Sequence, residues 1–201
     1  MQFKAIGFDY GNVMTASRTG YIESIASVLG LPVDKVRPVY FANNHLINIE
    51  GVSIENFAKI ITEQLGVPEK AAVLIKNFKK HAEPEIDSAM LALVDTLRSK
   101  NYKVGLLSNN RKEAGDHMRA IGLDKHFDTM IISAEVGVQK PSKQIFDLFI
   151  KKMGVSANEL IFIDDSHESL KLSGEIGFHP ILFKNYGLLV EQLTFLEILK
   201  K

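Results

Sequence analysis

Hydrophobic residues along the chain form two kinds of pattern. Between residue 19 and about residue 80 they recur at helical spacing, and no strand-like run separates them. After Glu83-Pro84-Glu85, where the proline discourages a continuing helix, short apolar runs alternate with helical patterns. One more apolar run, Phe3–Phe8, precedes the helical block. Strands that alternate with helices predict βαβ units, and therefore a parallel sheet with helices on both faces.

Five apolar runs have the length and composition of buried strands. They are Phe3–Phe8, Lys103–Leu107, Thr129–Ile132, Leu160–Ile163 and Pro180–Phe183. Helical patterns at residues 90–97, around Met118 to Gly122, and at residues 145–153, 170–176 and 188–199 lie between and after them. We predict that Asp9 follows a central strand of this sheet.

The helical block contains four predicted helices with short connections, as in a small bundle. The first ends at Gly30, and the second runs from Pro32 to Phe41. Ser53 is the predicted N-cap of the third, and Pro68 opens the fourth. The predicted fold class is α/β: a Rossmann-like parallel sheet with helices on both faces plus an inserted helical-bundle cap domain. Residues 1–14 and 86–201 would form the α/β core, and residues 15–85 the cap.

Composition narrows the class of protein. The 24 basic residues balance the 24 acidic ones, which argues against a nucleic-acid or membrane-surface partner. Cysteine is absent, which excludes disulfides, a thiol nucleophile and Cys-ligated zinc. A strand that begins at Phe3 leaves no room for a signal peptide, and no apolar run approaches the ~18 residues of a membrane span. We expect a cytoplasmic protein, a monomer or weak homodimer, with no nucleic-acid and no membrane partner.

Polar residues stand at or near the ends of the predicted strands. Asp9 follows the first strand, Ser108 the second, and the pair Asp164-Asp165 the fourth, while Lys140 lies in a loop. Each of them alone has an ordinary structural explanation as a turn residue, a helix cap or a solvated lysine. Ligands of open α/β sheets bind beyond the carboxyl ends of the strands. The set as a whole therefore indicates one functional site.

The chemistry of this set suits phosphoryl transfer. A carboxylate such as Asp9 can act as a nucleophile and divide phosphate-ester hydrolysis into two easier displacements. Ser108 and nearby backbone N–H groups can donate hydrogen bonds to the transferring group, and Lys140 can supply positive charge. Clustered carboxylates repel one another unless a cation lies between them, and oxygen ligands with open positions favour Mg²⁺.

Four motifs, in this order, resemble those of the haloacid dehalogenase-like (HAD) hydrolase superfamily. The motifs are Phe8-Asp9-Tyr10-Gly11-Asn12-Val13, Leu107-Ser108-Asn109, Lys140-Pro141 and Ile163-Asp164-Asp165-Ser166. The predicted helices between the first and second motifs are similar to the C1 cap of the phosphatase branch. The resemblance spans essentially the whole chain.

The resemblance also implies roles for individual residues. It implies Asp9 as the nucleophile, Ser108 as a donor to a phosphate oxygen and Lys140 as a neutralising cation. The implied phosphate-binding residues are Asp9, Tyr10, Gly11, Ser108, Asn109 and Lys140. The implied Mg²⁺ ligands are Asp9, the Gly11 backbone carbonyl and Asp165, with Asp164 as a further ligand or a supporting partner.

The chain departs from the family pattern at two positions. Most family phosphatases carry a second aspartate, the general acid and base, where this chain has Gly11. Ser169 stands where the family usually has Asp or Asn, which weakens the support of the metal site. A dehalogenase is disfavoured, because Tyr10 stands one residue too early for the tyrosine of that branch.

Two hypotheses of function follow. The first is a Mg²⁺-dependent phosphohydrolase that acts on a small phosphorylated metabolite through an aspartyl-phosphate intermediate. The alternative is a catalytically weakened relative that binds a phospho-ligand or a protein partner without useful turnover. Cap residues normally select the leaving group in this family. The candidate specificity residues are Arg18, Asn43, Asn44 and His45.

Overall fold

All five predicted strands form one parallel sheet. The computed structural model describes residues 3–16, 20–82 and 84–200. The strand order is β3-β2-β1-β4-β5. The strands are β1 (Ala5–Phe8), β2 (Lys103–Ser108), β3 (Thr129–Ile132), β4 (Leu160–Asp164) and β5 (His179–Leu182). Because β1 pairs with both β2 and β4, Asp9 emerges from the centre of the sheet, and the predicted α/β fold class is confirmed.

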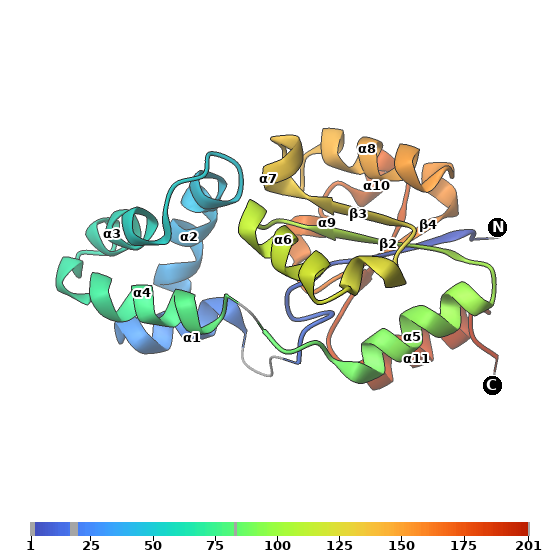
Figure 1. Ribbon diagram of the computed structural model, residues 1–201, viewed down its shortest axis with the longest axis horizontal. Helices are drawn as coiled ribbons and strands as arrows, with labels where there is room; N and C mark the ends of the chain where they lie inside the picture. The colour runs from blue at the N-terminus through green and yellow to red at the C-terminus, as the bar shows by residue number, and fades with distance from the viewer. Residues whose placement is uncertain (1–2, 17–19, 83, 201) are drawn as a thin grey trace.

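Helices cover both faces of the sheet (Figure 1). Side chains of β1 alternate between the faces: Ile6 and Phe8 belong to one hydrophobic cluster, and Ala5 belongs to the other. The first face carries α5 (Ser88–Ser99), α6 (Lys112–Ala120) and α11 (Tyr186–Phe195). The second face carries α8 (Lys143–Met153) together with the short helices α7 (Ser133–Val136), α9 (His167–Leu170) and α10 (Ser173–Ile176). Two 3₁₀ turns, η2 (Leu123–His126) and η3 (Ala157–Glu159), precede β3 and β4.

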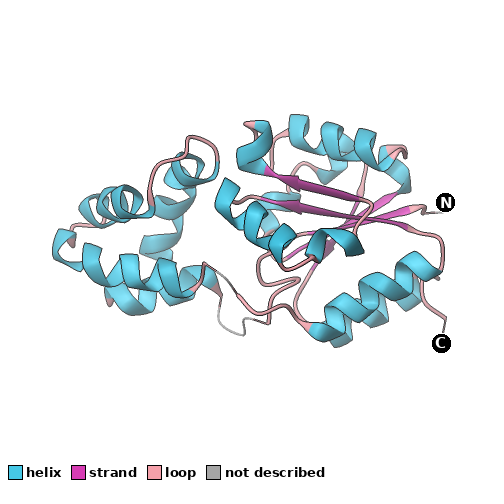
Figure 2. Cartoon of the chain, viewed as in Figure 1, coloured by secondary structure: helices cyan, strands magenta, loops and turns pink. Residues whose placement is uncertain are grey.

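Among the described residues between β1 and α5, all the regular elements are helices. They are α1 (Tyr21–Leu29), α2 (Val33–Asn48), α3 (Ile54–Gln64) and α4 (Ala71–Lys80), with a 3₁₀ turn η1 (Pro68–Lys70) before α4. We call α1–α4 the helical insertion. Its apolar side chains form a hydrophobic cluster separate from the two clusters of the sheet. Figure 2 shows it as an all-helical layer beside the sheet. Within the described residues no helix is long and apolar enough to cross a membrane.

The two connections to the helical insertion run next to each other. Thr15 and Ile86 form an antiparallel bridge. The carbonyl of Met14 accepts a hydrogen bond from the Asp87 N–H (2.9 Å), and the Ala16 N–H donates to the Glu85 carbonyl (2.9 Å). The chain therefore leaves and re-enters the sheet unit at one place. The domain boundaries at residues 14/15 and 85/86 stay a prediction.

Three helices differ from their predicted extents. The second helix of the insertion continues past Phe41 to Asn48, although it contains Pro38, which costs it one backbone hydrogen bond. The expected helix at residues 170–176 is instead the pair α9 and α10. The last helix ends at Phe195 rather than Leu199, and Glu197 takes a left-handed backbone conformation (φ 60°). The apolar side chains that follow pack back onto the sheet in a turn.

Candidate active site

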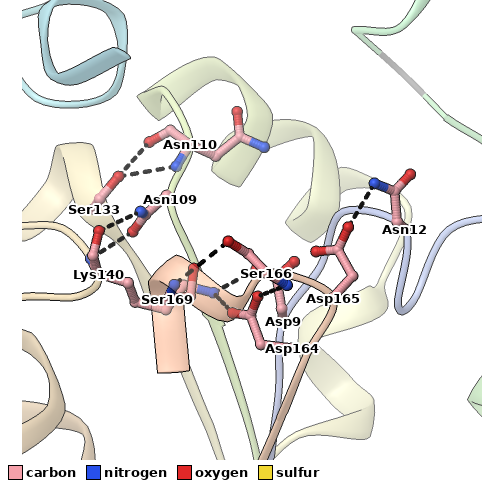
Figure 3. A network of polar contacts seen from close by, with 10 residues as sticks. All are labelled: Asp9, Asn12, Asn109, Asn110, Ser133, Lys140, Asp164, Asp165, Ser166 and Ser169. Carbon is pink, nitrogen blue, oxygen red and sulfur yellow. Dashed lines mark hydrogen bonds and ion pairs between the residues drawn. The ribbon is translucent and has the colours of Figure 1, made fainter. Parts of the chain in front are cut away.

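Four residues from distant parts of the chain meet at the carboxyl edge of the sheet (Figure 3). Asp9 follows β1, Asp164 ends β4, and Lys140 comes from the loop before α8. Lys140 Nζ lies 2.6 Å from Asp9 Oδ1 and 2.5 Å from Asp164 Oδ2. Asp165 lies next to this group, and its Oδ2 accepts a hydrogen bond from Asn12 Nδ2 at 2.8 Å. The predicted constellation is thus brought together, with Ser108 at the end of the neighbouring strand β2.

A reciprocal pair of hydrogen bonds holds Lys140 in place. The Asn109 side chain donates to the Lys140 carbonyl (2.8 Å) and accepts from the Lys140 N–H (2.8 Å). The Asn109 amide group therefore positions the lysine, and a contact of Asn109 with phosphate would use its backbone. The Tyr10 side chain packs in the hydrophobic core, where the residue is 4% exposed. A contact of Tyr10 with phosphate would therefore also use its backbone.

Burial and like charge act together on Asp9. Burial, together with the negative charges of Asp164 and Asp165, raises the pKa of this carboxyl to about 7, although Lys140 opposes the rise. Burial also raises the pKa of Asp165, although the hydrogen bond from Asn12 acts in the opposite direction and lowers it. Burial alone would lower the pKa of Lys140, but Asp164 and Asp9 outweigh it, so the pKa is raised and the ammonium stays charged. One cation among three carboxylates leaves an excess of negative charge.

The three carboxylates can share a cation. Asp9, Asp164 and Asp165 each offer an oxygen, and these oxygens lie within 4.8 Å of one another. Lys140 and the Ser166 N–H occupy the two oxygens of Asp164, whereas Asp9 Oδ2 has no hydrogen-bond partner among the described residues. Asp9 and Asp165 are therefore better placed than Asp164 as direct ligands. An all-oxygen donor set fits a hard divalent cation such as Mg²⁺.

The two positions that depart from the family pattern border the same site. The backbone of Gly11 is not left-handed, and a Cβ added to it would meet only Asp9 Oδ2, at 3.8 Å. Asn12, the next residue, takes the left-handed conformation instead (φ 55°). The Ser169 N–H donates to the hydroxyl of Ser166, which caps α9. Space for an acidic side chain at residue 11 is therefore present next to Asp9.

A cavity of about 540 Å³ connects the carboxylates with the helical insertion. On the sheet side Asp9, Ser108 and Lys140 line it. On the side of the insertion the wall combines polar, aliphatic and aromatic side chains, and the aromatic ones include Tyr21 and Tyr40. The sequence analysis missed these two residues, because in the hydrophobic pattern they look like ordinary members of the helical core.

The predicted specificity residues lie in different places. Asn44 lines the cavity. Asn43 is bonded to Gln64 (2.8 Å), His45 lies beside Glu50 (3.7 Å), and neither of them lines the cavity. Arg18 lies outside the described residues.

Comparison with known proteins identifies the family. Residues 8–182 match the family model described as haloacid dehalogenase-like hydrolase. The chain belongs to this family. Its match to the Bifunctional epoxide hydrolase 2 of Mus musculus is 29% identical over 117 residues, which are 56% of this chain and 21% of that protein. Its match to the Phosphorylated carbohydrates phosphatase of Thermotoga maritima is 25% identical over 154 residues, 63% of this chain and 71% of that protein.

A solved structure supports the fold of this HAD-like hydrolase. The HAD family enzyme bt-2542 of Bacteroides thetaiotaomicron, in complex with magnesium and inorganic phosphate, superposes with a TM-score of 0.61 at 20% identity. The superposition covers 93% of this chain and 98% of that one. The sheet and the helical insertion therefore occur together in a known HAD architecture.

Proposed function

We propose that this HAD-like hydrolase is a Mg²⁺-dependent phosphohydrolase that cleaves a small phosphorylated metabolite. The observation that carries the proposal is the environment of Asp9, where Lys140 holds Oδ1 at 2.6 Å and Oδ2 remains available. The resemblance of the four motifs and the phosphatase among the relatives support the same reaction.

Two displacements at phosphorus would complete the reaction. In the first, Asp9 Oδ2 forms a bond to phosphorus, and the bond between phosphorus and the ester oxygen breaks, so that the leaving group departs with the electron pair. In the second, a water oxygen attacks phosphorus and the bond to Asp9 breaks. The products are the alcohol or phenol and inorganic phosphate, and the Asp9 carboxylate is regenerated.

Lys140 and Ser108 would stabilise the charge of the transferring group. Lys140 is 3% exposed, and it already bridges Asp9 and Asp164. A buried ammonium in a fixed position interacts strongly with phosphoryl oxygens because little solvent screens it. The Ser108 hydroxyl lines the same cavity, where it can donate a hydrogen bond to a second oxygen.

Asp9, Asp165 and, as a supporting residue, Asp164 would hold Mg²⁺, as the donor set suggests. Bound there, the ion would neutralise the excess carboxylate charge and polarise the phosphoryl group. We further propose that residues 15–85 act as a cap domain over the site. In support, the helical insertion supplies one wall of the cavity that Asp9 lines.

Hydrolysis of p-nitrophenyl phosphate tests the proposal. We expect phosphate release that stops when EDTA removes divalent cations and returns when Mg²⁺ is added. Asp9→Asn keeps the shape of the side chain but removes the attacking charge, so turnover should fall by about 10⁴-fold or more. Asp147→Asn, a change at an exposed carboxylate of α8, is the control and should leave the rate unchanged.

Two results would contradict the proposal. Appreciable hydrolysis by pure Asp9→Asn would exclude the aspartyl-phosphate route. No turnover by wild type with Mg²⁺, combined with measurable phosphate binding, would instead support the alternative of a weakened relative that only binds.

A further inference from the structure

The wall that the helical insertion contributes to the cavity contains a cluster of aromatic rings. Tyr21 of α1 and Tyr40 of α2 meet edge to face, with ring centroids 5.7 Å apart. Phe78 stacks on Tyr21 (6.1 Å), and Phe57 meets Tyr40 edge to face (5.9 Å). All four residues line the cavity; Phe57 and Phe78 are buried, and Tyr21 and Tyr40 are half-buried. The contacts with the two phenylalanines therefore fix the two tyrosine rings, which are the more exposed of the four.

The polar groups of this wall already have partners within the protein. The hydroxyls of Tyr21 and Tyr40 interact with each other. His81 Nδ1 is 2.8 Å from the Asn77 carbonyl, and Asn44 Oδ1 accepts a hydrogen bond from Gln139 Nε2 (3.0 Å). A site that selects a polyhydroxylated sugar needs side chains that form hydrogen bonds with the sugar hydroxyls, because a buried hydroxyl without a partner loses binding free energy. This wall offers ring surface instead.

We propose that the helical insertion binds a flat aromatic leaving group, so that the preferred substrates are aryl phosphates. The inference rests on the proposed phosphohydrolase function and specifies its substrate class. Aromatic rings bind one another in offset-stacked or edge-to-face arrangements. Tyr21 and Tyr40 are the specificity-determining residues, and both lie in the cavity that contains Asp9.

The missing acid at Gly11 supports the same substrate class independently. When Asp9 Oδ2 attacks, the bond between phosphorus and the ester oxygen breaks, and that oxygen leaves with the electron pair. A phenolate, with a conjugate-acid pKa of about 10, leaves without a proton donor far more readily than an alkoxide of about 16. The phenolate then takes its proton from water. An aromatic wall and a site without an acid at residue 11 thus select the same kind of ester.

A pair of non-hydrolysable phosphonates separates ring binding from chemistry. Benzylphosphonate and cyclohexylmethylphosphonate carry the same phosphonate group on a flat and on a puckered ring, and their C–P bond is not cleaved. We expect calorimetry with wild-type protein and Mg²⁺ to show benzylphosphonate binding about 3- to 10-fold tighter. Equal affinity, or tighter binding of the cyclohexyl compound, would overturn the proposal whatever any variant shows.

Substitutions of Tyr40 then test whether this residue contacts the aromatic ring of the bound phosphonate. Tyr40→Leu should reduce the affinity ratio of the two phosphonates toward one, whereas Tyr40→Phe should keep it. Phe195→Leu is the matched control: it also replaces an aromatic ring with leucine, but on a residue that is 86% exposed and outside the cavity. A thermal midpoint checks the folding of each variant. An unchanged ratio in folded Tyr40→Leu would exclude Tyr40 as the specificity residue and contradict the proposal.

The outcome is distinguishable from a failure of the proposed function. If Asp9-dependent hydrolysis is observed but the two phosphonates bind equally, only the substrate class is wrong. If benzylphosphonate binds tighter but Asp9→Asn still hydrolyses p-nitrophenyl phosphate, only the proposed reaction is wrong.

Discussion

Asp9 has a different environment on each of its two carboxylate oxygens. Oδ1 accepts from the buried ammonium of Lys140, whereas Oδ2 faces the space above Gly11. The first contact keeps the carboxylate in place, and burial makes its negative charge costly and its pKa high. A carboxylate held in this way can use the second oxygen as a nucleophile. What the site lacks is a neighbouring acid at residue 11 to protonate the leaving group.

Replacing Gly11 by Asp tests this account. Because general acid catalysis is typically worth about 10²–10⁴-fold, Gly11→Asp should raise the rate for alkyl phosphates by up to that factor. The rate for p-nitrophenyl phosphate should change little, since its leaving group departs unassisted. The measurement is the slope of log kcat/KM against leaving-group pKa, which should be steep in wild type and flatter in the variant.

The structure removes one objection to this variant. The backbone of Gly11 is not in the left-handed conformation, and a Cβ at this position would lie 3.8 Å from Asp9 Oδ2, an ordinary van der Waals distance. The variant should therefore fold. Gly11→Ala is the matched control, because it adds the Cβ without the acid. If folded wild type already hydrolyses a sugar phosphate as fast as p-nitrophenyl phosphate, another group supplies the proton and our account of Gly11 is wrong.

At the level of secondary-structure elements, the contact of α8 with the sheet depends on two glycines. Gly7 of β1 and Gly105 of β2 are directly opposite each other in the parallel register. A Cβ on Gly7 would lie 2.7 Å from the ring of Phe149 in α8, and one on Gly105 would lie 2.6 Å from the same ring. The Gly7 Cβ would also meet Phe162 of β4 at 2.5 Å. The absence of side chains at both positions lets these rings pack directly on the backbone. The helix thereby covers the central strand that ends at Asp9.

We therefore expect Gly105→Ala to destabilise the protein by overpacking. The free energy of unfolding from urea denaturation should fall by about 1–3 kcal/mol, since Phe149 and Met153 must shift. Gly174→Ala, in α10, is the control, because its Cβ would meet no atom within 4 Å and its backbone is not left-handed. That control should be neutral or slightly stabilising. Equal stability of the two variants would show that this face of the sheet can accommodate a methyl group at residue 105, which would contradict the overpacking argument.

At the level of the whole molecule, polar contacts join the helical insertion to the sheet unit beside Lys140. Gln139, the residue before Lys140, accepts from Asn48 Nδ2 (3.3 Å) and donates to Asn44 Oδ1 (3.0 Å). The hydroxyl of Ser133, which is fully buried, contacts the Asn48 carbonyl at 3.0 Å. These contacts connect the helical insertion to the sheet unit.

Gln139→Ala should loosen this association. Two lost hydrogen bonds of about 1 kcal/mol each would shift the equilibrium between docked and undocked insertion by up to about 30-fold. Hydrogen–deuterium exchange should then quicken in peptides that cover residues 44–52 and 130–140. Gln192→Ala, at an exposed position of α11, should leave exchange in both peptides unchanged. Unchanged exchange in folded Gln139→Ala would mean that other contacts hold the insertion.

Local patterns in the sequence were sufficient for the order and type of the elements and for the grouping of the candidate site residues. The apolar run before Asp9 can only be a strand buried on both faces, and strand ends in a parallel sheet meet at one edge. That geometry brings Asp9, Ser108 and Asp164 together without any knowledge of packing, and Lys140 joins them from the loop before α8. The HAD motifs contain the same four residues.

Side-chain packing between distant segments decided the rest. Polar residues at the end of α2 gave no helical signal past Phe41, yet Asn44 and Asn48 continue the helix, where they meet Gln139. Tyr21 and Tyr40 fit a core pattern, and only the tertiary structure places them in the cavity that Asp9 also lines. Periodicity reports which face of a helix is apolar, but not what that face covers. The aromatic part of the cavity wall therefore follows from the tertiary arrangement alone.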